Sequence, residues 1–107
     1  MVENMAANEK SNPNADFFYK TILQLKTEKE CKAFFDDLCT VNEIAVISQR
    51  LQAAKLLCEK HTYNDIVKMT GISTATISRV NRALQFGNGG FDKAFGQTNT
   101  PRENHEK

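Results

Sequence analysis

Small hydroxyl residues followed by arginines form the part of this sequence best suited to bind a charged polymer. A Ser-Thr-Ala-Thr run at residues 73–76 precedes Arg79 and Arg82, and residues 68–86 contain no acidic residue. Small residues at a helix start let its backbone approach DNA, where free N–H groups attract phosphate. Arginine can reach guanine or a phosphate oxygen. The residues expected to contact double-stranded DNA are Asn64, Lys68, Ser73, Thr74, Ala75, Thr76, Ser78, Arg79 and Arg82.

Catalysis and metal binding have no comparable pattern. The two histidines, His61 and His105, belong to no recognisable Ser/His/Asp arrangement. Asp36 and Asp37 are adjacent, and neighbouring helical residues point about 100° apart, so these carboxylates cannot share a site. Cys58 and His61 are two metal ligands without a third nearby, which makes a weak site. We therefore predict no enzymatic activity, no metal and no cofactor.

The elements that would position the DNA-contacting residues form a helix-turn-helix. Thr62 and Asp65 have the spacing of a helix start, and Gly71 suits a sharp turn because glycine adopts positive φ freely. Ser73 is a suitable N-cap for the helix that follows, in which apolar residues recur at i, i+3 and i+7. Residues 63–86 are therefore predicted to be a helix-turn-helix, although a purely structural pair of helices shares this pattern.

Three further helices are predicted before this segment. The first begins near residue 14 or 16 and runs to residue 26, the second spans about 28–39, and the third spans about 40–60. Thr27 and Glu30 have capping-box spacing at the start of the second helix. No window alternates with period two, so the predicted fold class is all-α. The third helix carries an apolar stripe of Ile44, Ile47, Ser48, Leu51, Ala54 and Cys58.

The composition changes at both ends of the chain. Residues 1–13 are rich in polar residues and are predicted to form a flexible arm. Residues 14–90 are predicted to form the folded domain. Residues 91–107 are predicted to be a mostly disordered tail with at most one short helical turn around Phe91–Phe95.

The overall composition is that of an ordinary soluble globular chain. Its 107 residues are 40% hydrophobic and 25% charged. No apolar run approaches the ~20 residues needed to cross a bilayer, and the N-terminal residues lack an apolar secretion signal. The three cysteines lack C-x-x-C spacing, which favours reduced thiols. A cytoplasmic protein without a membrane association is expected.

Charge is divided unevenly along the chain. Residues 1–47 carry eight acidic and five basic side chains, whereas residues 48–86 carry six basic and two acidic ones. A basic segment of this kind can meet a polyanion, and it is also compatible with a solvated helix surface.

Large apolar side chains are abundant for so few packable residues. A monomer would expose part of this surface and a homodimer would bury it, so a homodimer is predicted. The aromatic residues concerned are Phe17, Phe18, Tyr19, Phe34, Phe35 and Phe86.

The chain also resembles the Trp-repressor-like helix-turn-helix family, in its YerC/YecD branch. The resemblance covers residues 14–90 and is carried by LCTVNEIAVISQRLQAAKLL at 38–57 and YNDIVKMTGISTATISRV at 63–80. It implies an all-helical, intertwined homodimer whose N-terminal helices wrap around the partner chain. It also implies that each subunit offers one recognition helix to successive major grooves of a near-palindromic operator.

The resemblance further implies a place for an effector. Repressors of this family sense tryptophan, and their ligand-holding residues correspond to Thr40, Arg50 and Arg79. Two positions depart from the family pattern, because Val80 replaces a pocket glycine and Ala83 replaces a pocket serine. The valine fills space that an indole needs, and the alanine lacks a hydrogen-bond acceptor. We therefore predict that tryptophan is not the effector, and the effector stays unknown.

These observations predict a sequence-specific DNA-binding transcriptional regulator, a repressor that binds a near-palindromic operator as a homodimer. The alternative is a helical interaction module that uses its basic face on an acidic partner protein. The hydroxyl-rich helix start at residues 73–76 favours DNA, because protein hot spots more often combine exposed tryptophan, tyrosine or arginine with apolar anchors.

Overall fold

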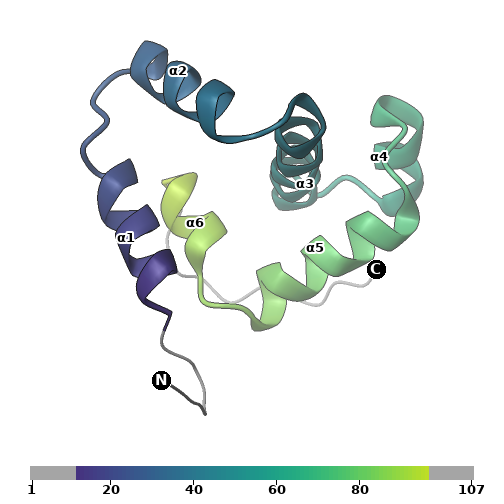
Figure 1. Ribbon diagram of the computed structural model, residues 1–107. Coiled ribbons are helices and arrows are strands. Elements are labelled where there is room, and N and C mark those ends of the chain that lie inside the picture. The colour runs from purple at the N-terminus through teal and green to yellow at the C-terminus, as the bar shows by residue number, and fades with distance from the viewer. Residues whose placement is uncertain (1–11, 97–107) are drawn as a thin grey trace. The chain divides into compact units, whose positions relative to one another are not determined.

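The computed structural model describes residues 12–96, which form six helices and no strand (Figure 1). The prediction of an all-α fold is confirmed. None of the helices in this range is long and apolar enough to cross a membrane. The described residues divide into two compact units, residues 12–41 and 42–96. Residues 1–11 and 97–107 lie outside the described range, so these parts of the predicted arm and tail stay predictions, whereas residues 12 and 13 of the predicted arm form the start of the first helix.

The first unit contains helices α1 (Pro13–Ile22) and α2 (Glu28–Leu38). Phe18 of α1 meets Phe35 of α2 edge to face, with ring centroids 6.3 Å apart. No residue of either helix is buried. An aromatic contact therefore joins these helices without enclosing a core.

Side-chain caps define where α1 and α2 begin. Asn12 accepts hydrogen bonds from the backbone N–H groups two and three residues later, at 3.1 and 3.3 Å. Thr27 accepts one from the N–H of Glu30 at 3.1 Å, as its spacing predicts. The Glu30 carboxylate does not return this bond to Thr27 and instead accepts from the N–H of Lys26 at 2.7 Å. Both helices thus begin with backbone N–H groups satisfied locally.

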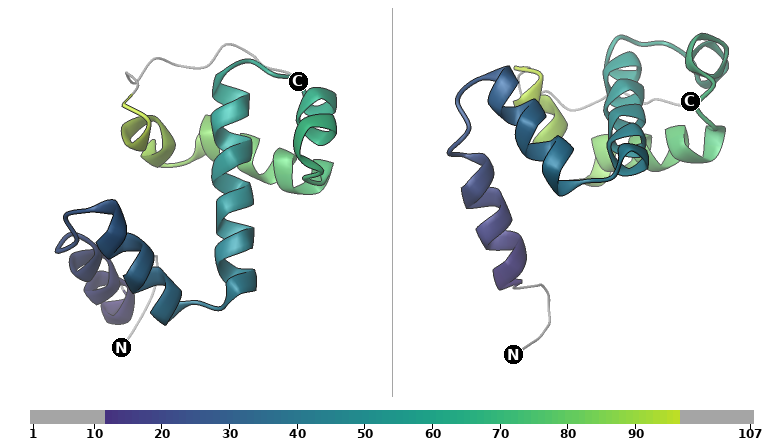
Figure 2. Two further views of the ribbon diagram at one scale, coloured as in Figure 1. Left: turned by 90° about the horizontal axis from the view of Figure 1, so that it is seen from above. Right: turned by 45° about the horizontal axis from the view of Figure 1, so that its top comes forward.

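The second unit is built from α3 (Val41–Cys58), α4 (Tyr63–Thr70), α5 (Thr74–Phe86) and α6 (Gly90–Ala94). Figure 2 shows α5 crossing α3, with α4 and α6 on opposite sides of α3. The buried residues lie where α3, α4 and α5 meet, and they are Ala53, Ala54, Ile66, Ile72, Ile77 and Val80.

The burial along α3 differs from the apolar stripe predicted for the third helix. Of that stripe only Ala54 is buried, whereas Ile47 is 52% and Leu51 is 47% exposed. Ala53, outside the stripe, is fully buried. The two buried residues of α3 both lie in its C-terminal half, so the core of this unit meets α3 there.

The segment after α5 contributes to the same core. Gly87 ends α5, where an added Cβ would collide with the carbonyl oxygen of Ala83. The short helix α6 follows, in agreement with the single turn predicted near Phe91. The rings of Phe91 and Phe95 stack with centroids 6.1 Å apart, and both pack against the core. The packed region therefore extends to Phe95.

Candidate nucleic-acid interface

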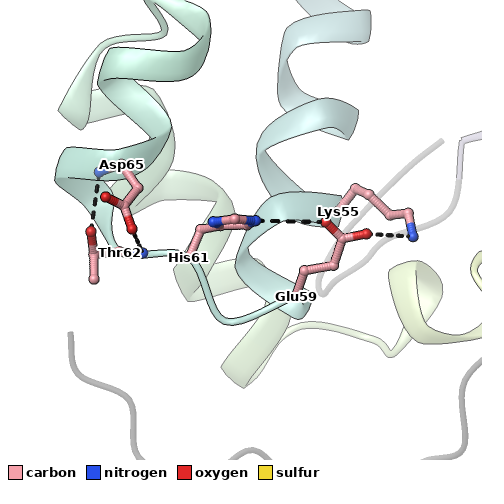
Figure 3. Close-up of polar contacts among 5 residues, drawn as sticks. All are labelled: Lys55, Glu59, His61, Thr62 and Asp65. Carbon is pink, nitrogen blue, oxygen red and sulfur yellow. Dashed lines mark hydrogen bonds and ion pairs between the residues drawn. The ribbon is translucent and has the colours of Figure 1, made fainter.

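The helix-turn-helix begins with a complete capping box at the start of α4. The N–H of Asp65 donates to Thr62 Oγ1 at 3.1 Å, and the N–H of Thr62 donates to Asp65 Oδ2 at 3.4 Å (Figure 3). This is the reciprocal pattern that the spacing of the two residues predicts. It also commits the Asp65 carboxylate to the protein backbone.

The turn between α4 and α5 depends on a glycine and on a threonine that the sequence reasoning missed. Gly71 has a φ of 78°, which is a left-handed backbone conformation that residues other than glycine adopt at an energetic cost. The Thr70 hydroxyl donates to the carbonyl of Ile66 at 2.6 Å and accepts from the N–H of Ile72 at 3.0 Å. It thereby holds buried Ile72 under the turn. A threonine directly before the turn glycine is the signal that could have indicated this role.

The start of α5 is capped by Ser73. Its hydroxyl accepts from the N–H of Thr76 at 3.1 Å and donates to Thr76 Oγ1 at 3.1 Å. Ser73 was predicted both as an N-cap and as a DNA contact, and the structure shows the first role. The hydroxyls of Ser73 and Thr76 are thus engaged with each other.

The residues predicted to contact DNA all lie on α4, on α5 or at the cap of α5, and most are exposed. The buried side of α5 consists of Ile77 and Val80. Thr76 is half-buried. The other predicted residues are exposed, and they are Asn64, Lys68, Ser73, Thr74, Ala75, Ser78, Arg79 and Arg82. Helix α5 therefore presents a face of small and basic side chains opposite its apolar side.

The two acidic side chains of residues 48–86 are both engaged in contacts within the protein. In residues 48–86 the only acids are Asp65, in the capping box, and Glu59. Lys55 Nζ lies 2.9 Å from Glu59 Oε2, and His61 Nε2 lies 3.9 Å from Glu59 Oε1 (Figure 3). The hydrogen bond from Lys55, together with its charge, lowers the pKa of Glu59, and the same contacts raise the pKa of Lys55.

The basic residues of the interface are free of such pairs. Within residues 12–96, no acidic side chain forms an ion pair with Lys68, Arg79 or Arg82. Unpaired cations on a helix surface attract the phosphates of a nucleic acid. The geometry and charge of this surface therefore suit a polyanion.

The junction between α3 and α4 contains a second left-handed residue. Lys60 has φ 74°, and its N–H donates to the carbonyl of Leu57 at 3.0 Å. The N–H of His61 donates to the carbonyl of Leu56 at 3.1 Å. These two bonds form the Schellman motif that ends α3 and directs the chain into α4. The sequence carries no glycine here, so this turn was not predicted.

The candidate effector residues lie on three separate elements. Thr40 directly precedes α3, Arg50 is exposed on α3, and Arg79 is exposed on α5. Val80, at the position of the family's pocket glycine, is only 3% exposed and belongs to the core. Ala83 is exposed on α5. The valine thus fills space beside α5 with a packed side chain.

Comparison with known proteins agrees with this geometry. The model of the family described as Trp repressor protein matches residues 13–99. The chain belongs to this family. It is 51% identical over 80 residues to the uncharacterized protein YerC of Bacillus subtilis (strain 168), across 75% of this chain and 77% of YerC. The resemblance to the YerC/YecD branch is therefore confirmed.

Two solved structures of Trp-repressor-like proteins share the fold. A TrpR-like protein from Eubacterium eligens ATCC 27750 is 46% identical, with a TM-score of 0.75 over 86% of this chain and 95% of that one. A candidate Trp repressor from Staphylococcus aureus is 48% identical, with a TM-score of 0.76 over 80% of this chain and 86% of that one.

Proposed function

We propose that this Trp repressor family member is a cytoplasmic transcriptional regulator, a repressor that binds a near-palindromic operator as a homodimer. The observation that carries the proposal is the exposed face of α5, which bears small hydroxyl side chains and unpaired arginines. A helix-turn-helix places its second helix in the major groove, with the N-terminal residues of that helix at the base edges. In this chain that helix is α5.

The rest of the helix-turn-helix supports this orientation of α5. Ile66, Ile72 and Ile77 are buried between α4, the turn and α5, so the two helices pack as one element. Lys68 of α4 is exposed and has no acidic partner in the described range. It is a suitable phosphate contact, because lysine binds phosphate as a compact point charge.

The apolar surface of α1 and of the chain around it supports the homodimer. Phe17 is 72% and Leu23 is 78% exposed, and Val41 at the start of α3 is 87% exposed. Large apolar side chains that stay exposed in one chain are typical of protein–protein contacts. A twofold dimer also matches a palindromic operator, since each half-site receives one recognition helix.

The test is to measure DNA affinity of Arg79→Ala and Arg82→Ala over a range of salt concentrations. If one arginine binds guanine, its loss should cost about 1–3 kcal/mol and relax specificity at one base pair. If it binds only phosphate, affinity should fall evenly and the salt slope should decrease by about one. Lys29→Ala, an exposed cation on α2, is the control and should leave specificity unchanged.

Unchanged affinity of both arginine variants would show that α5 does not enter the groove. An absence of binding to any duplex at low salt would favour the alternative, an acidic partner protein.

We further propose that tryptophan does not regulate this protein. Val80 packs in the core, and overpacking a site by a few methylenes costs ~1–3 kcal/mol. Calorimetric titration with tryptophan, with and without operator DNA, should show neither micromolar binding nor a gain in DNA affinity. Micromolar binding with a matching gain would contradict the proposal, because coupling between two ligands is reciprocal.

A further inference from the structure

The polar groups at the start of α5 are unequally available. The hydroxyls of Ser73 and Thr76 bond to each other, and the N–H of Thr76 is capped by Ser73. The N–H of Ile77 bonds to the carbonyl of Ser73 at 3.0 Å. These bonds therefore fix the orientation of the Ser73 hydroxyl and occupy an acceptor site of the Thr76 hydroxyl.

Thr74 and Ala75 are left as the exposed side chains of the first turn. Neither has a side-chain bond in the described range, and both are exposed. Thr74 carries a γ-methyl group beside its hydroxyl and Ala75 carries a β-methyl group, so the first turn has two exposed residues with methyl groups. Long side chains enter this face only later, at Arg79 and Arg82.

The major groove contains one matching apolar group. Thymine carries a 5-methyl group there, whereas the edges of guanine, adenine and cytosine present hydrogen-bond donors and acceptors. Threonine and alanine methyl groups pack against thymine methyl groups in protein–DNA contacts. Arginine farther along the helix is too long for this contact and suits guanine or phosphate.

We infer that Thr74 and Ala75 read thymine in each half-site through contacts between methyl groups. This inference rests on the proposed insertion of α5 into the major groove. It assigns the base class recognised by the first turn of the helix, and it assigns Ser73 and Thr76 to holding that turn in shape.

The experiment uses the full chain and a duplex that it selects from a random pool. Each thymine of the duplex is replaced in turn by deoxyuridine, which lacks the 5-methyl group and keeps the pairing. At one thymine of a half-site, affinity should fall about fourfold, as expected when one buried methyl contact is lost. Fluorescence anisotropy gives the affinities.

Two variants remove the protein's side of the contact. Thr74→Ser deletes only the methyl group and keeps the hydroxyl, and Ala75→Gly deletes the other methyl. At least one should bind the thymine duplex about fourfold more weakly and should no longer distinguish deoxyuridine from thymine. Thr62→Ser is the matched control, because it also deletes one threonine methyl while keeping the hydroxyl that caps α4, and it should keep the full deoxyuridine effect. Circular dichroism confirms that the variants are helical.

Equal affinity for every deoxyuridine duplex would overturn the inference, and so would a deoxyuridine effect that persists in both Thr74→Ser and Ala75→Gly. In either case binding to the selected duplex is retained, so the proposed function would stand. Failure to select any duplex would instead contradict the proposed function itself.

Discussion

The two units of this chain bury their side chains to very different extents. Helices α1 and α2 of the first unit contain no buried residue, and their contact is a cluster of aromatic rings. The second unit encloses six buried apolar residues shared among α3, α4, the turn and α5. Helix α2 in the first unit and helix α4 in the second both begin with a threonine side-chain cap. Local helix signals are therefore similar in the two units, and the difference lies in packing.

We infer from this difference in burial that the two units obtain their stability from different sources. Isolated short helices are marginal in water, so most helical stability in proteins comes from packing an apolar face. The second unit supplies such a face within one chain. The first unit exposes its large apolar side chains and, in our proposal, completes its packing with a second copy.

Substitutions in the first unit that break the proposed dimer should have the largest effect, both on molecular mass and on operator affinity. In the double variant Phe17→Asp/Leu23→Asp, two highly exposed apolar side chains on or just after α1 become charged. The wild type should have twice the 12.1 kDa chain mass at micromolar concentration, and the variant should have the single-chain mass. Operator affinity should fall on the order of 100-fold or more, because the two half-sites are no longer linked. Light scattering and anisotropy measure the two effects.

Gln24→Asp provides the control for added charge, because Gln24 is a polar exposed neighbour in the same unit. It should stay dimeric. A wild-type protein that remains monomeric across the micromolar range would remove the proposed explanation for the exposed surface of α1.

Creating a cavity in the second unit should have the next largest effect. Ile77 is fully buried, so Ile77→Ala should lower the free energy of unfolding by about 2–5 kcal/mol, and Ile77→Val by about 0.5–1.5 kcal/mol. The loss should be independent of protein concentration. Leu23→Ala should instead cause a loss that depends on concentration, because its partner is proposed to lie on another chain. Urea unfolding at two protein concentrations distinguishes Ile77→Ala from Leu23→Ala. If the stability losses of the two variants depended on protein concentration in the same way, the proposed difference between the two units would be contradicted.

Removing one helix cap from each unit should have the smallest effect on stability, and the two cap variants are the most closely matched pair. Thr62 and Thr27 each accept a bond at 3.1 Å from the N–H three residues later, one in each unit. Thr62→Ala and Thr27→Ala should each cost about 1 kcal/mol. Thr62→Ala should lower the stability of the core helices, whereas Thr27→Ala should weaken dimerisation. Native-state hydrogen exchange at two protein concentrations distinguishes them, and the serine variants, which keep the hydroxyl, should show little change.

The helix-turn-helix could be predicted in detail from the sequence. Its capping box, the left-handed Gly71 and the Ser73 cap are all contacts between residues a few positions apart. Their geometry depends on local backbone chemistry, which the residue types specify. The turn at Lys60 was missed for a related reason, because its bonds are made by backbone groups and its residue type carries no signal.

The candidate interface could be predicted only in part. The exposure of Arg79 and Arg82 follows from helical spacing, because the apolar residues of α5 occupy the opposite side of the helix. The bond between the Ser73 and Thr76 hydroxyls could not be predicted, because either side chain could equally have faced DNA. The role assigned to Thr74 and Ala75 arises from that bond.

Sequence alone determined the helix starts, the turn and the polar face of α5, since these depend on neighbours within about one helical turn. The tertiary structure alone decided which side of α3 is buried. Helical spacing made Ile47 and Leu51 as good core candidates as Ala54, yet the residues of α3 buried with α4 and α5 are Ala53 and Ala54. Burial depends on where another element arrives, and small residues such as Ala53 and Ala54 are buried because they let that element come close.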